Sequence, residues 1–243
     1  MYECPLHDAG IFCFNAESLP EVELINELAT EYNIVARIAI RVNPGVAAHT
    51  HANITTGLAE NKFGINYELL EETIDNIKEF KNVKLIGLHF HIGSQIMDMN
   101  DFATLCSRIN EIQDTLERKM SLVLPNINVG GGLGIDYYQP SKKPIPDFAA
   151  YFATYAENLK RRPGQQVHFE LGRSLVGQCG SLISRVTYIK RGTCKQFAII
   201  DAGMNDLVRP ALYQAYHEIE NLTSDATEQD VYDIVGPICE SSD

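Results

Sequence analysis

The sequence has little positive charge and lacks long apolar runs. Its 20 lysine and arginine residues stand against 32 aspartate and glutamate residues, which gives a net charge of −12. A chain this acidic is a poor match for nucleic acid or for an anionic membrane surface, although it leaves room for a local basic pocket that binds a phosphate. No apolar run approaches the roughly 18 residues of a membrane span, so we expect no transmembrane helix.

Paired cysteine motifs and a secretory signal are also lacking. No two cysteines form a CxxC pair, and Glu3 and Asp8 interrupt the N-terminus before any apolar stretch. These features predict a cytoplasmic protein whose thiols are reduced and mostly buried. The six cysteines are Cys4, Cys13, Cys106, Cys179, Cys194 and Cys239.

What is present is an alternation of apolar strands and amphipathic helices. The predicted strands are Gly10–Asn15, Ile34–Val42, Val83–Leu88, Leu122–Val129 and Gln166–Glu170. One predicted helix begins at a capping box formed by Ser18 and Glu21. Three further predicted helices cover residues 68–80, 101–120 and 147–160. This order predicts an α/β fold with the parallel strands of a TIM-type (β/α)8 barrel, whose site lies at the carboxyl ends of the strands.

The alternation stops near Gly177. Leu182–Ile189 and Gln196–Ile200 are predicted strands with no helix between them. We therefore predict a partial barrel over residues 1–177 and the start of a β-rich C-terminal domain over residues 178–243. The barrel strands are fewer than a closed (β/α)8 barrel needs, so we expect a fragment that lacks N-terminal barrel strands and the C-terminal end.

Three of the predicted strands lead into residues with binding chemistry. HFHIGSQ spans His89–Gln95, NVGGGLG spans Asn128–Gly134, and FELGRSLVG spans Phe169–Gly177. Together they offer a face for an aromatic ring, backbone N–H groups for a phosphate, and a carboxylate. This combination indicates a phosphorylated heteroaromatic cofactor.

Two of these motifs also have plain structural interpretations. The glycines at 130–134 are as consistent with a packing turn as with phosphate binding, and no Lys-Ser/Thr follows them as in a Walker A loop. His89 and His91 share one face of a strand, as zinc ligands can, but no third ligand has convincing spacing. His49 and His51 form a similar pair in a loop. We expect no metal site.

Glu170 and Arg173 admit two interpretations. They form either a structural ion pair across the turn at Gly172 or two separate contacts to a bound molecule. In the second case Arg173 binds a phosphate, and Glu170 keeps a ring nitrogen protonated.

Two later motifs carry candidate substrate and catalytic groups. RPALYQAYH places Arg209 and Tyr213 on one helical face, either as an arginine over a tyrosine ring or as an anchor for a substrate carboxylate. CESSD places Cys239 beside Glu240, and this cysteine is either a plain buried residue or a functional thiol.

Taken together, the motifs resemble those of the fold-type III, pyridoxal-phosphate-dependent amino-acid decarboxylases, and they lean toward the diaminopimelate branch. The resemblance covers essentially the whole chain and implies an alanine-racemase-like barrel, a C-terminal β-domain and a homodimer with sites shared across the interface. It rests, in order, on RVNPGVAAHTH, TGLAENKFGI, GLHFHIGSQI, NVGGGLGIDY, ELGRSLVG, DAGMNDLVRPALYQAYH and VGPICESSD.

The resemblance implies pyridoxal 5'-phosphate as the cofactor. His91 would stack on its ring, Glu170 would contact the pyridine nitrogen, and Arg173 with the glycines would hold the phosphate. The residues implied in cofactor binding are His91, Ser94, Gly131, Gly132, Glu170, Gly172 and Arg173.

It also implies the reaction, which is decarboxylation of meso-2,6-diaminopimelate to L-lysine and CO2. The implied catalytic residues are His91, Cys239 and Glu240, with Cys239 a candidate proton donor in the neighbouring subunit's site. The implied substrate-binding residues are Arg173, Arg209, Tyr213 and Glu240. A dimer contact between Lys62 of one chain and Asp243 of the other is implied as well.

The sequence departs from the family pattern at two points. Leu171 stands where the family commonly has proline, and no lysine matches the family's Schiff-base lysine. Lys84 lies at the wrong end of its strand, and Lys142 and Lys143 lie in a proline-flanked loop. Because that lysine is central to binding and turnover, we expect this chain alone to bind the cofactor weakly and to form no Schiff base of its own.

Two alternatives remain open. One is a decarboxylase of the ornithine, arginine or carboxynorspermidine type, whose substrate would have less use for Arg209. The other is a non-catalytic relative that acts by hetero-dimerising, which the missing lysine favours and the retained His91, Glu170 and Cys239 disfavour.

Overall fold

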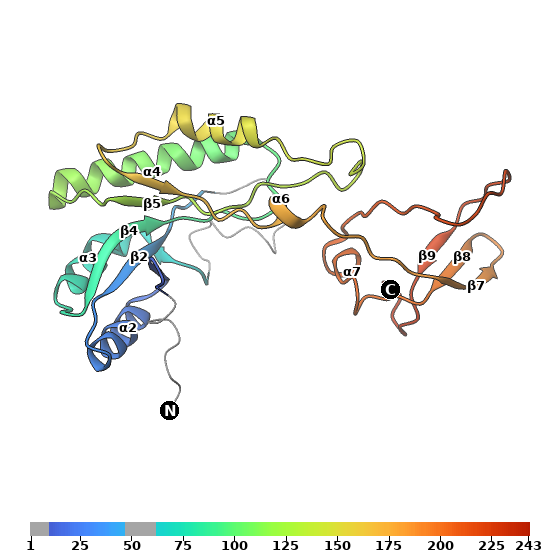
Figure 1. Ribbon diagram of the computed structural model, residues 1–243, viewed down its shortest axis with the longest axis horizontal. Helices are drawn as coiled ribbons and strands as arrows, with labels where there is room; N and C mark the ends of the chain where they lie inside the picture. The colour runs from blue at the N-terminus through green and yellow to red at the C-terminus, as the bar shows by residue number, and fades with distance from the viewer. Residues whose placement is uncertain (1–9, 47–61) are drawn as a thin grey trace. The chain divides into compact units, whose positions relative to one another are not determined.

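The computed structural model describes residues 10–46 and 62–243, and it divides into two compact units, described separately below (Figure 1). The first unit takes its described residues from 1–134 and 146–175, and the second comprises residues 135–145 and 176–243. The segment 135–145 therefore belongs to the C-terminal unit, although it lies upstream of β6 and α6 of the first unit in the sequence.

The first unit is built on a parallel sheet with the strand order β1-β2-β4-β5-β6, in which β3 also pairs with β2. Every pairing in it is parallel, which confirms the predicted α/β class. The strands are β1 (Phe14–Ala16), β2 (Ala36–Asn43), β3 (Ile65–Asn66), β4 (Val83–His89), β5 (Asn126–Asn128) and β6 (Gln166–His168).

Helices connect most of these strands, as parallel pairing favours, and one more follows β6. They are α2 (Leu19–Glu31), the 3-10 helix η2 (Tyr67–Leu69), α3 (Leu70–Lys78), α4 (Met99–Met120), α5 (Phe148–Asn158) and α6 (Arg173–Val176). The predicted capping box is confirmed at the start of α2. The Ser18 hydroxyl accepts a hydrogen bond from the Glu21 backbone N–H, and the Glu21 carboxylate accepts one from the Ser18 N–H.

The core of this unit lies between the sheet and its helices. Ile40 of β2, Leu88 of β4 and Phe102 of α4 are fully buried within it. Phe102 also packs edge-on against Tyr151 of α5, with ring centroids 4.9 Å apart. Since burying one such side chain contributes about 1.5–3 kcal/mol, this core fixes the positions of the strand ends.

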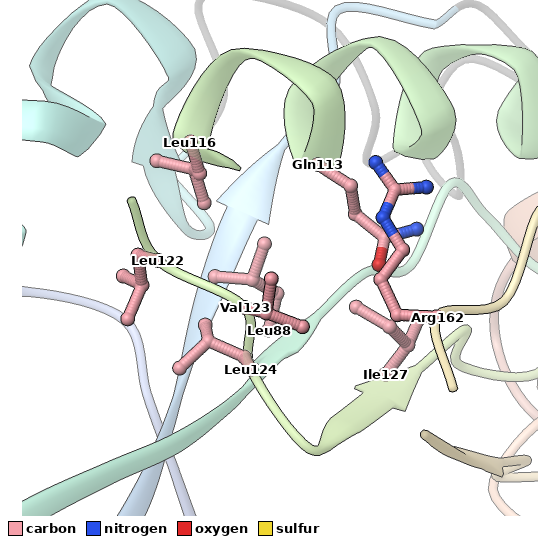
Figure 2. Close-up of a pocket in the computed structure, with 8 residues that line it drawn as sticks. All are labelled: Leu88, Gln113, Leu116, Leu122, Val123, Leu124, Ile127 and Arg162. Atoms are coloured by element: carbon pink, nitrogen blue, oxygen red, sulfur yellow. The ribbon is translucent and has the colours of Figure 1, made fainter. Parts of the chain in front are cut away.

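A small apolar hollow of about 10 Å³ remains in this unit (Figure 2). Its lining is Leu88, Gln113, Leu116, Leu122, Val123, Leu124, Ile127 and Arg162. Arg162 is already paired with Asp114 and Glu117. The hollow offers no free acid or base, so we assign it to packing.

Two strand predictions in this unit were partly wrong. β5 begins at Asn126 rather than at Leu122, because Pro125 lacks the N–H that a strand needs for its ladder. β3 lies in a stretch for which no strand was predicted, and its two residues are too short for a periodic pattern.

The second unit contains a three-stranded sheet of β7 (Val186–Arg191), β8 (Gln196–Ile200) and β9 (Asp233–Val235), with helix α7 (Arg209–Tyr213). β7 pairs with β8 in antiparallel fashion, and β8 pairs with β9 in parallel. All residues of β7 are exposed. β9 was not predicted, since only three residues form it.

The predicted burial of the cysteines was mostly wrong. The described cysteines form no disulfide with one another, but only Cys106 is buried, whereas Cys179, Cys194 and Cys239 are exposed. These three belong to the second unit, whose few core residues leave its loops open. Within residues 10–46 and 62–243, no helix combines the length and the apolarity that crossing a membrane requires.

Candidate functional site

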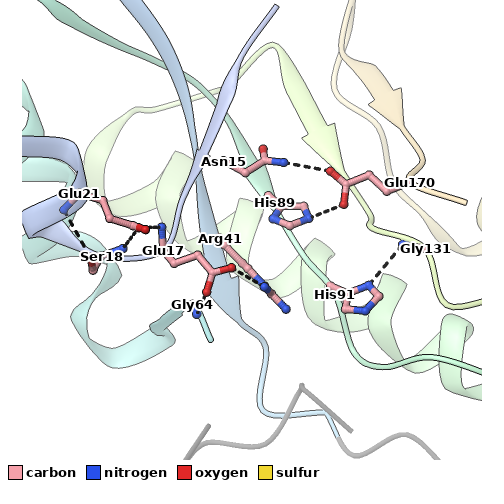
Figure 3. Close-up of polar contacts among 10 residues, drawn as sticks. All are labelled: Asn15, Glu17, Ser18, Glu21, Arg41, Gly64, His89, His91, Gly131 and Glu170. Atoms are coloured by element: carbon pink, nitrogen blue, oxygen red, sulfur yellow. Dashed lines mark hydrogen bonds and ion pairs between the residues drawn. The ribbon is translucent and has the colours of Figure 1, made fainter. Parts of the chain in front are cut away.

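Glu170 lies just beyond β6, and side chains from three other strands hold its carboxylate. The Asn15 amide of β1 donates to Oε1 at 2.9 Å, and His89 Nε2 of β4 lies 3.0 Å from Oε2; Figure 3 draws both contacts. The Asn128 amide of β5 donates to Oε1 at 2.7 Å. Parallel strands bring their carboxyl ends to one edge of the sheet, so residues far apart in sequence converge on one carboxylate.

These contacts keep Glu170 ionised. They lower its pKa to about 2; the hydrogen bond with His89 is the largest cause, and partial burial opposes it. The side chain is still 43% exposed, so a bound molecule can reach the carboxylate. Glu170 forms no ion pair with Arg173, so the interpretation of these two residues as a structural ion pair was wrong.

His91 lies two residues beyond the end of β4 and is half-buried. Its Nδ1 accepts a hydrogen bond from the Gly131 N–H at 3.4 Å, which orients the ring (Figure 3). Burial, followed by the charges of Arg41 and His89, lowers the His91 pKa to about 4. At neutral pH the imidazole is therefore uncharged, and a neutral ring suits stacking on another aromatic ring.

The glycines after β5 are required by close packing. A Cβ on Gly130, Gly131 or Gly132 would clash with the carbonyl oxygen of Phe90, Glu170 or Gly93 respectively. Gly130 and Gly132 also have positive φ values of 73° and 103°. The packing interpretation is thus confirmed for this turn, and a role in phosphate binding needs other support.

Such support comes from the turn after β6. A Cβ on Gly172 would meet nothing within 4 Å, so the protein's own packing does not require glycine there. Close approach to a ligand is another reason for a glycine. The buried Ser174 hydroxyl has no hydrogen-bond partner in the described part of the chain. Arg173 donates to the Gln95 side chain at 3.2 Å, and Ser94 lies half-buried beside Gln95.

A charged contact that the sequence did not predict lies at the end of β2. Arg41 Nη1 is 2.5 Å from Glu17 Oε1, and Glu17 Oε2 accepts from the Gly64 N–H at 3.2 Å (Figure 3). Glu17 thus joins the segments after β1 and before β3 to the end of β2. It also fixes the Arg41 charge that helps to keep His91 neutral.

An open hollow of about 180 Å³ reaches this edge of the sheet. Asn15, Asn128 and Glu170 all line it. The complete lining is Phe12, Cys13, Asn15, Ala39, Leu88, Asn126, Asn128, His168 and Glu170.

In the second unit, Arg209 lies between two tyrosine rings at the start of α7. Its guanidinium carbon is 4.9 Å from the centroid of the Tyr137 ring and 5.5 Å from that of Tyr213. No carboxylate in the described part of the chain pairs with Arg209, and its buried Nε has no hydrogen-bond partner there. The tyrosine contacts agree with one predicted interpretation, and the unpaired charge agrees with the other.

Cys239 and Glu240 lie together on an exposed turn that Asp243 ties to its neighbours. The Asp243 carboxylate accepts hydrogen bonds from the Met204 N–H and, at 2.6 Å, from the Ile238 N–H. A Cβ on Gly203 would lie 2.9 Å from Asp243 Oδ1, so that glycine leaves room for the carboxylate. The implied contact of Asp243 with Lys62 of another chain stays a prediction.

The described residues contain no group of three or more His, Cys, Asp and Glu side chains that could hold a metal ion. His89 instead pairs with Glu170. His49 and His51 lie outside the described residues.

Comparison with known proteins gives this arrangement a family. Residues 5–177 match the model for the pyridoxal-dependent decarboxylases, pyridoxal binding domain. The chain belongs to this family. It is 66% identical over 96% of its length to diaminopimelate decarboxylase of Bacteroides thetaiotaomicron, and 42% identical over 97% to that of Neisseria meningitidis serogroup B. It spans 60% and 56% of the lengths of these two relatives.

Solved structures agree on the fold. Diaminopimelate decarboxylase of M. jannaschii in complex with L-lysine superimposes with a TM-score of 0.83 at 38% identity, covering 98% of this chain and 55% of that one. The Helicobacter pylori enzyme, also complexed with L-lysine, gives a TM-score of 0.81 at 35% identity, covering 98% and 58%.

Proposed function

We propose that this protein binds pyridoxal 5'-phosphate and decarboxylates meso-2,6-diaminopimelate to L-lysine and CO2. One observation carries the cofactor assignment, namely the ionised Glu170 carboxylate held by His89, Asn128 and Asn15 at the strand ends. A fixed anion at that edge is the partner that a protonated pyridine nitrogen needs.

The residues present fit this cofactor. Gly172 leaves its neighbourhood open, and the buried Ser174 hydroxyl lacks a partner in the described part of the chain. Arg173 is the charged group of that turn, and a guanidinium suits a phosphate because it can form two parallel hydrogen bonds. Ser94, Gly131 and Gly132 belong to the facing turns. When bound, the cofactor supplies an electron-accepting ring for the carbon that loses CO2.

The described residues would orient that ring and set its charge. His91 presents a neutral imidazole face, and its hydrogen bond with Gly131 prevents the ring from rotating. Glu170 would hold a proton on the pyridine nitrogen of the bound cofactor, which would keep its ring cationic. No described lysine lies directly at the end of β1, β2, β4, β5 or β6, so covalent attachment is outside what these strand ends supply.

The second unit would bind the substrate and return a proton. Arg209 has no carboxylate partner in the described part of the chain, and it is the group we assign to a substrate carboxylate, with Tyr213 beside it. We assign to the exposed Cys239 thiol the donation of the proton that replaces the departing carboxylate, with Glu240 as its neighbour. Arg173 and Glu240 complete the proposed substrate contacts.

We further propose a homodimer in which the Cys239 turn serves the neighbouring subunit's site, and action in the cytoplasm, where free thiols stay reduced. The diaminopimelate decarboxylases among the relatives favour this substrate over ornithine or arginine. Arg209 points the same way, because diaminopimelate carries a second carboxylate for it to bind.

The test is a substrate panel. The protein as its gene encodes it is incubated with pyridoxal phosphate and, separately, with meso-diaminopimelate, ornithine, arginine and lysine, and CO2 release is measured. We expect release from diaminopimelate alone, with stoichiometric L-lysine. Release from ornithine or arginine instead would support the polyamine-type alternative, and no release from any substrate would support a non-catalytic role.

A further inference from the structure

Beside Arg209 lies a histidine to which the proposed function gives no role. The centroid of the His217 ring is 5.0 Å from that of Tyr137, edge to face at 70°. The Arg209 guanidinium contacts the same tyrosine ring at 4.9 Å. His217 and Arg209 therefore meet at one aromatic side chain of the segment 135–145.

The backbone explains how His217 returns to the start of α7. The helix ends at Gln214, which adopts a left-handed conformation with φ of 51°. The Ala215 N–H then bonds back to the Arg209 carbonyl at 3.4 Å, so the chain reverses within one turn. Tyr216 stacks on Tyr138 with ring centroids 4.8 Å apart, which fixes the stretch that carries His217.

Both side chains keep an unsatisfied polar atom in this cluster. Arg209 Nε and His217 Nε2 are shielded from solvent and have no hydrogen-bond partner in the described part of the chain. Buried polar atoms are normally paired, so two such atoms on neighbouring side chains indicate a ligand with at least two acceptor oxygens. A carboxylate has two acceptor oxygens, and its negative charge would pair with Arg209, which has no carboxylate partner in the described part of the chain.

We propose that His217 is a further substrate-binding residue, whose imidazole N–H donates a hydrogen bond to the substrate carboxylate that Arg209 binds. The inference rests on the proposed function, and it concerns the carboxylate at the end of diaminopimelate that does not react. That group survives in the product L-lysine and is missing from 1,5-diaminopentane, the same carbon chain without carboxylates.

The state of the histidine suits this role. Burial, followed by the Arg209 charge, lowers the His217 pKa, so the ring is neutral and can keep one nitrogen as a donor. Arg209 then supplies the positive charge for the carboxylate, and His217 donates a hydrogen bond to it from a different side. A carboxylate seated between them is selected over an amine, which Arg209 would repel.

The test compares two ligands on matched variants of the protein as its gene encodes it, loaded with pyridoxal phosphate. Calorimetry measures the Kd of L-lysine and of 1,5-diaminopentane for wild type, His217→Phe, His217→Asn and Tyr216→Phe. Because one hydrogen bond to a charged carboxylate is lost, His217→Phe should weaken lysine binding about 10- to 100-fold and leave diaminopentane unchanged. His217→Asn, which keeps a donor, should recover part of the loss, and the control Tyr216→Phe should match wild type.

Equal weakening of both ligands would mean that His217 only supports the local structure, and unchanged lysine binding in His217→Phe would refute the inference outright. The KM for diaminopimelate should rise with the lysine Kd while kcat stays near wild type. A wild-type protein that binds lysine through His217 but releases no CO2 from diaminopimelate would overturn the proposed function alone. A wild-type protein that does neither would overturn both.

Discussion

The two units of this protein present their candidate residues in contrasting ways. In the first, Glu170 and His91 follow strands of a packed parallel sheet, and side chains from β1, β4 and β5 fix the Glu170 carboxylate. In the second, Arg209 and Cys239 lie on a five-residue helix and an exposed turn. The comparison indicates that the residues proposed to bind the cofactor are fixed by the fold itself, whereas the residues proposed to bind the substrate depend on a few local contacts.

Replacing Glu170 by Gln should have the largest effect, because it removes the anion on which three side chains converge. Hydrogen bonds to charged groups contribute about 1.5–3 kcal/mol, so decarboxylation should slow by about 10- to 100-fold or more. The measurement is kcat with saturating pyridoxal phosphate. Glu157→Gln, an exposed change on α5, is the control and should leave kcat unaltered. Normal turnover in Glu170→Gln would remove this carboxylate from the chemistry.

Replacing the two arginines tests whether the first unit binds the cofactor and the second binds the substrate. Arg173→Ala should raise the Kd for pyridoxal phosphate by about tenfold or more and change the KM for diaminopimelate less. Arg209→Ala should raise the KM for diaminopimelate and change the Kd for pyridoxal phosphate less. Fluorescence titration of the cofactor and steady-state kinetics measure the two constants, with the exposed Arg161→Ala as control. If the two effects were exchanged, the roles assigned to these residues would have to be exchanged as well.

Replacing Asp243 tests how much the Cys239 turn depends on the hydrogen bonds that the Asp243 carboxylate accepts. Asp243→Ala removes the acceptor for the Met204 and Ile238 N–H groups, so the turn should loosen. Because the turn is exposed, we expect a modest fall in kcat of about 3- to 10-fold, with little change in cofactor affinity. Asp225→Ala, an exposed change in the same unit, is the control. A loss of cofactor equal to the loss of turnover would show that Asp243 acts on the whole fold.

A pH series tests the electrostatics of the first unit with the smallest expected effect. His91 has a folded-state pKa of about 4 and an unfolded value near 6.5, so between these values the unfolded state binds more protons. The free energy of unfolding of the cofactor-free protein should therefore fall as the pH drops from 6.5 to 4. After allowance for solvent screening the change is on the order of 1 kcal/mol.

Urea unfolding at each pH measures this change, and His91→Phe should flatten the curve in that window. Glu170→Gln should lower the curve at neutral pH and change its slope chiefly below the ordinary carboxyl pKa of 4.5, since the folded-state pKa of Glu170 is about 2. A curve for His91→Phe that parallels wild type from pH 6.5 to 4 would contradict the burial of a neutral imidazole.

Much of the fold of the first unit could be predicted from sequence, because its signals are local. The expected elements formed within a few residues of their predicted positions. They are β4 from an apolar run, α2 from a capping box, and α4 from an amphipathic pattern of apolar residues. β9 and β3 could not be predicted, since strands of two or three residues have no measurable alternation. Their pairing depends on partners far away in the chain.

The same distinction holds for the site. Glu170, His91 and Arg173 stand in recognisable motifs at strand ends. Asn15 and Asn128, which fix Glu170, carry no such signal, because an asparagine at a strand end is common in turns as well. The ring contact between His217 and Tyr137 could not be predicted from the sequence either, because it requires that the segment 135–145 belong to the C-terminal unit.

The central claim, that Glu170 holds a proton on the cofactor ring, can be measured directly. Pyridoxal phosphate labelled with 15N at the pyridine position is bound to the wild-type protein and to Glu170→Gln, and the 15N chemical shift is followed from pH 6 to 9. The account predicts a protonated nitrogen throughout in wild type and an unprotonated one in the variant. An unprotonated nitrogen in wild type, or a protonated one in both proteins, would contradict it.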